Sequence, residues 1–195
     1  LIFQRYRNFL NYQIKNQKLK IKTLYFLDRK NIIIKFVIMK ITLLVVGKTT
    51  DSHIEALTQD YLKRISHYIS FDFQVLPDIR NTRSLSEEQQ KVAEGELILK
   101  SVPNNAYLVL FDEHGEELRS VELAQWVNKK MSGLSVPIVF LIGGPYGFSK
   151  AVYERADARL SLSKLTFSHQ MVRLIAVEQL YRAMTILHGE PYHHE

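Results

Sequence analysis

Residues 136–147 read VPIVFLIGGPYG, an uninterrupted apolar run that leads directly into a loop with three glycines. Such a run is typical of a strand that is buried on both faces, as in a parallel sheet. Ligands of open α/β sheets bind at the carboxyl ends of the strands, where glycine lets the main chain approach them closely. In isolation, however, the loop is more simply a tight turn, because its glycines match neither a dinucleotide fingerprint nor a phosphate-binding loop.

Strand and helix patterns alternate around this run, from residue 39 onward, which predicts one α/β domain with a mostly parallel sheet. A turn at residues 112–115 is expected to end the third strand. The strands are expected at residues 41–46, 71–76, 107–111, 136–142 and 159–162.

Side chains that can accept a hydrogen bond from a first helical turn mark where the helices begin. Asp51 or Ser52 is suited to cap one helix. Ser86, followed by Gln89 three residues later, forms the capping-box pattern that predicts the next helix. Ser120 is expected to cap the helix that runs through Met131, and a short helix is expected after Ser149.

The last helix, expected over residues 168–188, carries apolar side chains nearly all the way round. One apolar face packed on a sheet does not account for such a pattern. The helix is therefore either central in the fold or covered on its outer face by a second subunit, and we predict a homodimer that uses part of it.

The positive charge is concentrated at the start of the chain. Residues 1–38 hold nine of the 26 Lys and Arg residues and one of the 20 acidic residues, so the net charge of +6 belongs to this leader. The leader shows no helical or strand period, and Lys35 interrupts the apolar segment that a signal peptide would need. We interpret residues 1–38 as a non-native or disordered basic leader, Met39 as the true start and residues 39–195 as a single domain.

Composition excludes several classes of site. The chain contains no cysteine, which rules out disulfide bonds, a thiolate zinc site and a cysteine nucleophile. No segment approaches the roughly 18 apolar residues that indicate a membrane span. The stretch Gly47-Lys48-Thr49-Thr50 looks like the end of a phosphate-binding loop, but that motif requires a glycine where Thr42 stands. A nucleotide-binding hydrolase is therefore disfavoured.

Two further segments suit a ligand or a substrate. Residues 161–168 alternate hydroxyl and apolar side chains, as a site for an adenine ring held by main-chain amides would, although Ser168 is equally suited simply to cap a helix. At the C-terminus, Tyr192 precedes His193 and His194. This is a weak pattern for a metal site but a suitable one for stacking on an unstacked base; an untethered tail is the alternative.

In their order along the chain, these segments resemble the RlmH family of ribosomal RNA methyltransferases, which belongs to the knotted SPOUT class. The likeness covers essentially all of residues 39–195. It rests on residues 39–47, Phe111-Asp112, 141–145 with Gly147, 162–167, His169 with Arg173, Glu178 with 180–183, and 191–193.

The resemblance implies a SPOUT fold, with helices on both faces of the sheet and a C-terminal trefoil knot, a rare exception to unknotted chains. It also implies a homodimer that binds S-adenosylmethionine in the knot and needs neither a metal nor a membrane. The cofactor residues that it implies are Phe111, Gly143, Leu162, Ser163, Lys164, Leu165, Thr166 and Phe167.

The reaction implied by the resemblance is methylation of N3 of a pseudouridine, at position 1915 in helix 69 of 23S ribosomal RNA, on the assembled ribosome in the cytoplasm. We expect His193 to act as general base or to position the substrate, and Tyr192 to stack on the base. His169 and Arg173 are expected nearby, and Glu195 is a weaker candidate for the base.

One position departs from the family pattern, because His194 stands where the family's ending Tyr-His-Arg-Glu has an arginine. Histidine pairs with a phosphate only when it is protonated, which bears on the strength of the tail's contacts with RNA. A catalytically silent ribosome-binding module with the same fold is the main alternative function.

Overall fold

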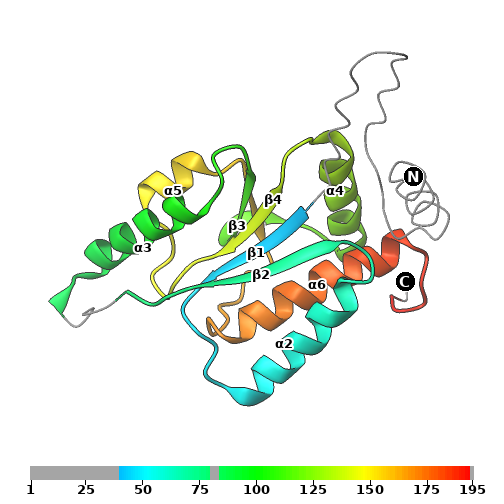
Figure 1. Cartoon of the computed structure of the whole chain (residues 1–195), viewed down its shortest axis with the longest axis horizontal. Helices are drawn as coiled ribbons and strands as arrows, with labels where there is room; N and C mark the ends of the chain where they lie inside the picture. The colour runs from blue at the N-terminus through cyan, green and yellow to red at the C-terminus, as the bar shows by residue number, and fades with distance from the viewer. Residues whose placement is uncertain (1–39, 80–83, 194–195) are drawn as a thin grey trace, which may run out of the picture.

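The computed structural model describes residues 40–79 and 84–193, which form one sheet covered by helices (Figure 1). The strand order is β2-β1-β4-β3-β5, and each neighbouring pair is parallel. The predicted parallel α/β sheet is confirmed, whereas the trefoil knot stays a prediction. The leader and Met39 lie outside the described residues. The strands are β1 (Lys40–Val46), β2 (Ser70–Leu76), β3 (Tyr107–Glu117), β4 (Ile138–Ile142) and β5 (Ala158–Ser161).

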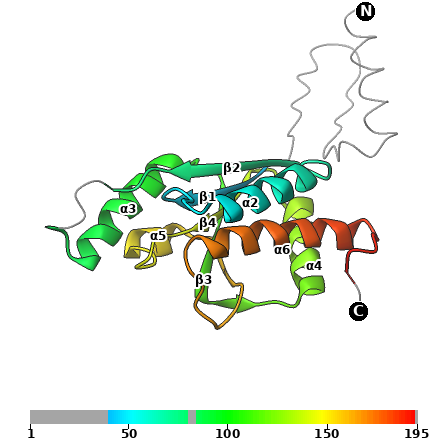
Figure 2. The ribbon, with the colours of Figure 1, turned by 90° about the horizontal axis from the view of Figure 1, so that it is seen from below.

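Helices cover both faces of the sheet (Figure 2). One face carries α2 (Ser52–Ile65), α4 (Ser120–Gly133) and α6 (Met171–Leu187), and the other carries α3 (Glu87–Ser101) and α5 (Lys150–Arg155). Alternate side chains of β1 pack against the two helix layers. Leu43 lies in the core beneath α2, α4 and α6, and Leu44 lies in the core beneath α3 and α5. In the described ranges, no helix has the length and hydropathy needed to cross a bilayer.

The central strand β4 is buried along its whole length and pairs with β1 on one side and β3 on the other. This burial is what the apolar run predicts, although strand pairing begins at Ile138 rather than at residue 136. The next strand along the chain, β5, also agrees with its prediction to within one residue at each end.

Two of the predicted helix caps are confirmed by their hydrogen bonds. The carboxylate of Asp51 accepts from the main-chain N–H of Ile54 at 3.1 Å, and Ser86 forms both bonds of a capping box with Gln89. The prediction that Ser120 caps α4 is wrong by one residue, because Arg119 occupies the cap position. Glu122 reaches back and accepts from the main-chain N–H of Arg119 at 2.8 Å, so a serine hydroxyl is not needed there.

The prediction that β3 ends at the turn of residues 112–115 is also wrong, because the strand continues to Glu117. The register with β5 shifts between Phe111 and Glu116, which both pair with Leu160, so the extra residues form an irregularity inside the strand. A Cβ at Gly115 would lie 2.5 Å from the carbonyl carbon of Leu160. Glycine at this position therefore lets the bulged strand return to its partner.

The last helix begins at Met171, three residues later than predicted. The hydroxyl of Ser168 accepts from the main-chain N–H of Met171 at 3.2 Å, so the predicted cap does hold the turn that enters the helix. Most of α6 is buried within this one chain, but the Met171 side chain is 43% exposed. The central position of α6 thus accounts for much of its apolar pattern.

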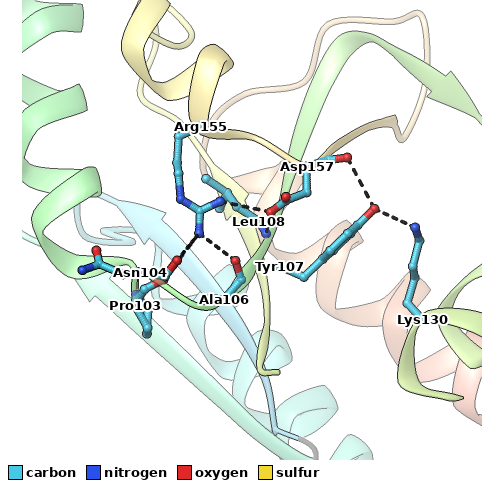
Figure 3. A network of polar contacts seen from close by, with 8 residues as sticks. All are labelled: Pro103, Asn104, Ala106, Tyr107, Leu108, Lys130, Arg155 and Asp157. Atoms are coloured by element: carbon cyan, nitrogen blue, oxygen red, sulfur yellow. Dashed lines mark hydrogen bonds and ion pairs between the residues drawn. The ribbon is translucent and has the colours of Figure 1, made fainter. Parts of the chain in front are cut away.

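Polar contacts between distant residues fix the start of β5 against β3 (Figure 3). The guanidinium of Arg155 donates to the carbonyl oxygen of Ala106 at 2.7 Å and to the carboxylate of Asp157 at 3.0 Å. The same carboxylate accepts from the main-chain N–H of Leu108 at 2.8 Å. Arg155 and Asp157 therefore join the turn after α5 to the first residues of β3.

We predict that Arg155→Ala lowers the free energy of unfolding by about 1–3 kcal/mol, because it leaves the partly buried Ala106 carbonyl without a donor. Urea denaturation measures the change. Lys150→Ala on the same helix is the control, since its side chain is 89% exposed; it should change stability by less than about 0.5 kcal/mol. Equal effects of the two substitutions would contradict the role of the network.

Candidate functional site

Because the strands are parallel, their carboxyl ends lie at one edge of the sheet (Figure 1). Of the predicted cofactor segments, Gly143 follows β4 and residues 162–167 follow β5 at this edge, while Phe111 lies within β3, between these two strands. The Phe111 ring stacks on Phe140 with centroids 5.3 Å apart and is buried. The ring therefore belongs to the core.

The glycine loop after β4 is a tight turn with specific packing requirements. The main-chain N–H of Gly147 donates to the Gly144 carbonyl at 3.2 Å, and Gly147 has a φ of +80° that favours glycine. A Cβ at Gly143 would lie 2.8 Å from the ring of Phe148, which is buried. Gly143 thus permits the close packing of Phe148, whatever it contributes to a ligand.

Glu94 of α3 lies against this loop, and sequence reasoning did not single it out. The residue is 4% exposed, and its Oε1 accepts from the Gln90 side chain at 2.8 Å. A Cβ at Gly144 would lie 2.3 Å from Oε2 of Glu94, so the carboxylate occupies the space that a side chain would need. Burial raises the pKa of Glu94 above its ordinary value; the Gln90 bond partly opposes this, and the charge of Asp78 adds to it.

The loop after β5 is held by its own hydroxyl groups. Ser161 donates to the Ser163 carbonyl at 3.0 Å, and the Ser163 hydroxyl accepts from the main-chain N–H of Leu165 at 3.0 Å. Lys164 forms an exposed ion pair with Glu117 at 3.2 Å. This leaves the Leu165 side chain 74% exposed, which is unusual for leucine and provides an apolar surface at the predicted adenine site.

Gln170 connects this loop to the loop after β1, and sequence reasoning missed it as well. Its side-chain oxygen accepts from the main-chain N–H groups of Thr50 at 2.8 Å and of Asp51 at 3.0 Å. Its amide nitrogen donates to the Thr50 hydroxyl at 3.0 Å. A phosphate-binding loop needs its main-chain N–H groups free for the ligand, so these contacts further disfavour that interpretation of residues 47–50.

Arg173, a predicted catalytic residue, is 1% exposed and binds the loop after β1 from the buried side. Its guanidinium donates to the Val46 carbonyl at 2.7 Å and to the Thr49 hydroxyl at 3.0 Å. Burial lowers the pKa of Arg173, and the charge of Asp78 partly opposes that shift. These contacts suit a residue that positions the loop. By contrast, His169 is exposed, two residues before α6 begins.

The predicted catalytic Tyr192 lies at a different part of the molecule. Its hydroxyl donates to Glu178 at 3.0 Å and lies 3.2 Å from the Tyr61 hydroxyl. Its ring contacts Tyr181, with centroids 4.9 Å apart, and the guanidinium of Arg182 lies 4.7 Å from the ring centroid. Burial is the largest cause that raises the pKa of Tyr192. Tyr192 is thus docked on α2 and α6 rather than untethered.

One chain does not bring all the predicted site residues together. Figures 1 and 2 show the tail at the opposite end of α6 from the loop that precedes the helix. The helix rises about 15 Å along its axis between Met171 and Tyr181 alone. Tyr192 and the half-buried His193 are therefore separated from residues 162–167, whereas His169 and Arg173 lie beside that loop. His194 and Glu195 lie outside the described residues.

No three His, Cys, Asp or Glu side chains within residues 40–79 and 84–193 are grouped so that they could hold a metal ion. The polar groups at the described edge are main-chain groups, hydroxyls, one buried carboxylate and one buried guanidinium.

Comparison with known proteins gives a consistent result. The sequence model of the family described as predicted SPOUT methyltransferases matches residues 39–193. The ribosomal RNA large subunit methyltransferase H of Bacteroides fragilis is 57% identical over 157 residues, which are 80% of this chain and 100% of that protein. Proteins of the same name from Phocaeicola vulgatus and Flavobacterium johnsoniae are 57% and 50% identical over the same shares of both chains.

We predict that Arg173→Lys destabilises the protein by about 1–3 kcal/mol, because one amine does not replace the two donors that hold Val46 and Thr49. Thermal and urea unfolding measure the change. Arg159→Lys is the matched control, because Arg159 is exposed; its effect should be below about 0.5 kcal/mol. An Arg173→Lys protein as stable as the control would remove the positioning role.

Proposed function

This chain belongs to the SPOUT methyltransferase family, and we propose that it methylates N3 of a pseudouridine in helix 69 of 23S ribosomal RNA. The coarser activity, methylation of large-subunit ribosomal RNA, is the one named in relatives that are 50–57% identical. The observation that carries the proposal is that Gly143 and residues 162–167 follow β4 and β5 at one edge of the sheet, with Phe111 of β3 between these strands.

The proposed methyl donor is S-adenosylmethionine, and the residues at this edge fit it. The exposed Leu165 offers an apolar surface for an adenine ring. Oε2 of Glu94 is buried and accepts no hydrogen bond from the described residues, as suits a ligand that brings positive charge. When bound, the cofactor supplies an activated methyl group that needs no metal.

The protein's own part in the reaction is to align the substrate and to remove a proton. The new N3–methyl bond forms as the bond from sulfur to that methyl breaks, and the N3 proton leaves to a base. We assign the base or the substrate contact to His193 and stacking on the pseudouridine to Tyr192. His169 lies where it can contact RNA beside the cofactor loop, and Arg173 positions the loop after β1. Holding the reacting atoms in line accounts for the remaining rate enhancement.

The separation of tail and cofactor loops supports a homodimer in which each site is completed by the other subunit. Antiparallel packing of two α6 helices about a two-fold axis would bring the tail of one chain to the cofactor loops of its partner. Met171 is exposed at the start of α6, and Leu174 and Ile175 are only partly buried, so this helix retains an apolar surface for such a contact.

The assembled ribosome in the cytoplasm is the substrate that we propose, rather than free RNA. Without residues 1–38 the chain has 17 basic and 19 acidic side chains, a poor balance for binding RNA through phosphate contacts alone. A folded ribosomal surface can be recognised by its shape as well as by its charge. The silent ribosome-binding module remains the second candidate, and a methyl-transfer assay separates the two.

We predict that the purified protein transfers labelled methyl from S-adenosylmethionine to ribosomes whose pseudouridines carry no N3 methyl group. His193→Ala should lower the single-turnover rate by roughly 100-fold or more while leaving cofactor affinity unchanged. His67→Ala is the control, because His67 is exposed at the end of α2. Ribosome binding without any label transfer would favour the silent module, and wild-type turnover by His193→Ala would remove that residue from the reaction.

A second prediction concerns the shared site. A chain truncated after Pro191 and a full chain with Leu165→Arg should each be inactive, the first for lack of the tail and the second for lack of cofactor binding. When the two are mixed and allowed to exchange subunits, roughly a quarter of the wild-type activity should return, since half of the dimers then contain one complete site. A mixture that stays inactive despite proven exchange would place the tail and the cofactor loops of each site in one chain.

A further inference from the structure

A buried carboxylate beside the glycine loop has no role in the reaction described above. Glu94 lies in the middle of α3, and the helix presents this acidic side chain to the core rather than to solvent, with 4% exposure. Only one of its two oxygens is hydrogen-bonded within the described residues: Gln90 donates to Oε1, and Oε2 has no donor. Buried carboxylates are ordinarily paired, so the free oxygen calls for an explanation.

The charges around Glu94 indicate the charge that a ligand at this position would carry. Within residues 40–79 and 84–193, Glu94 forms no ion pair, and the charged group that acts on it most strongly is another acid, Asp78. Burial is the main cause that raises the pKa of Glu94, and the charge of Asp78 adds to it, which reflects the cost of keeping a negative charge here. A positive group brought by a ligand would offset it.

The position of Oε2 indicates which ligand could bring that group. A Cβ at Gly144 would fall 2.3 Å from Oε2, so the free oxygen lies directly against the loop that contains the predicted cofactor residue Gly143. The predicted adenine loop, residues 162–167, follows β5, whereas Gly144 follows β4, two places away in the sheet. A cofactor whose adenine lies over the first loop would therefore direct its non-adenine end toward the glycine loop.

We propose that Glu94 binds a positively charged group of the methyl donor, either its α-ammonium or its sulfonium. This inference rests on the proposed function, and it names a cofactor-binding residue outside the segments that the sequence resemblance implies. Charge-assisted hydrogen bonds of this kind are among the strong ones, so the loss of the charge should cost roughly 10- to 100-fold in affinity.

Isothermal titration calorimetry with three ligands tests the proposal. S-adenosylmethionine carries both positive groups, S-adenosylhomocysteine carries the ammonium alone, and 5′-methylthioadenosine carries neither. Glu94→Gln, which keeps the shape of the side chain, should weaken S-adenosylmethionine roughly 10- to 100-fold and leave 5′-methylthioadenosine unchanged. A parallel loss for S-adenosylhomocysteine assigns the contact to the ammonium, and an unchanged affinity assigns it to the sulfonium.

Glu96→Gln is the matched control, because Glu96 lies two residues further along α3 and is exposed. Gly144→Ala provides a second route, since its Cβ must push the Glu94 carboxylate aside and should reproduce the pattern of Glu94→Gln. Equal losses for all three ligands would show that Glu94 only shapes the loop, and unchanged affinity for S-adenosylmethionine would show that it makes no contact; either result overturns the proposal. If the wild-type protein binds no S-adenosylmethionine, the proposed function fails instead.

Discussion

The burial of β4 on both faces is the constraint on which the rest of the structure depends. All five of its side chains are buried between two helix layers, and this requires a neighbouring strand on each side and helices above and below. Each connection must then cross over the sheet, which keeps the strands parallel and brings their carboxyl ends to a single edge. The candidate cofactor segments are together for this reason, although Phe111 and Leu162 are far apart in the sequence.

At that edge, α6 connects the loops to the remainder of the fold. Gln170 and Arg173 hold the loop after β1 by contacts that span 120 and 127 residues, while the other end of the helix carries the docked tail. The Gln170 contacts explain why a loop resembling a phosphate-binding sequence does not have the free main-chain N–H groups of one. Together with those of Arg173, they also join the start of α6, which follows the predicted adenine loop, to the segment between β1 and α2.

The same helix separates the two halves of the proposed chemistry. Residues that suit a cofactor precede α6, and residues that suit an RNA base follow it, so a rigid helix prevents them from meeting within one chain. The second subunit that we propose would bring them together without any change in the fold. Glu94 lies on α3, in the opposite helix layer. Its carboxylate contacts the glycine loop because Gly144 has no side chain to occupy that space.

Sequence alone determined what depends on neighbouring residues. The apolar run of β4, the caps at Asp51 and Ser86, and the alternation of strands and helices follow from local periodicity and hydrogen bonding, and all were predicted. The order of segments was also enough to indicate the family. Only the tertiary structure decided that β3 continues past its bulge and pairs again with Leu160 of β5, that Gln170 and Arg173 hold the loop after β1, and that Glu94 faces Gly144. Each of these contacts joins residues that are distant in the chain, and no local pattern records such a pairing, because it exists only once the sheet has brought the partners together.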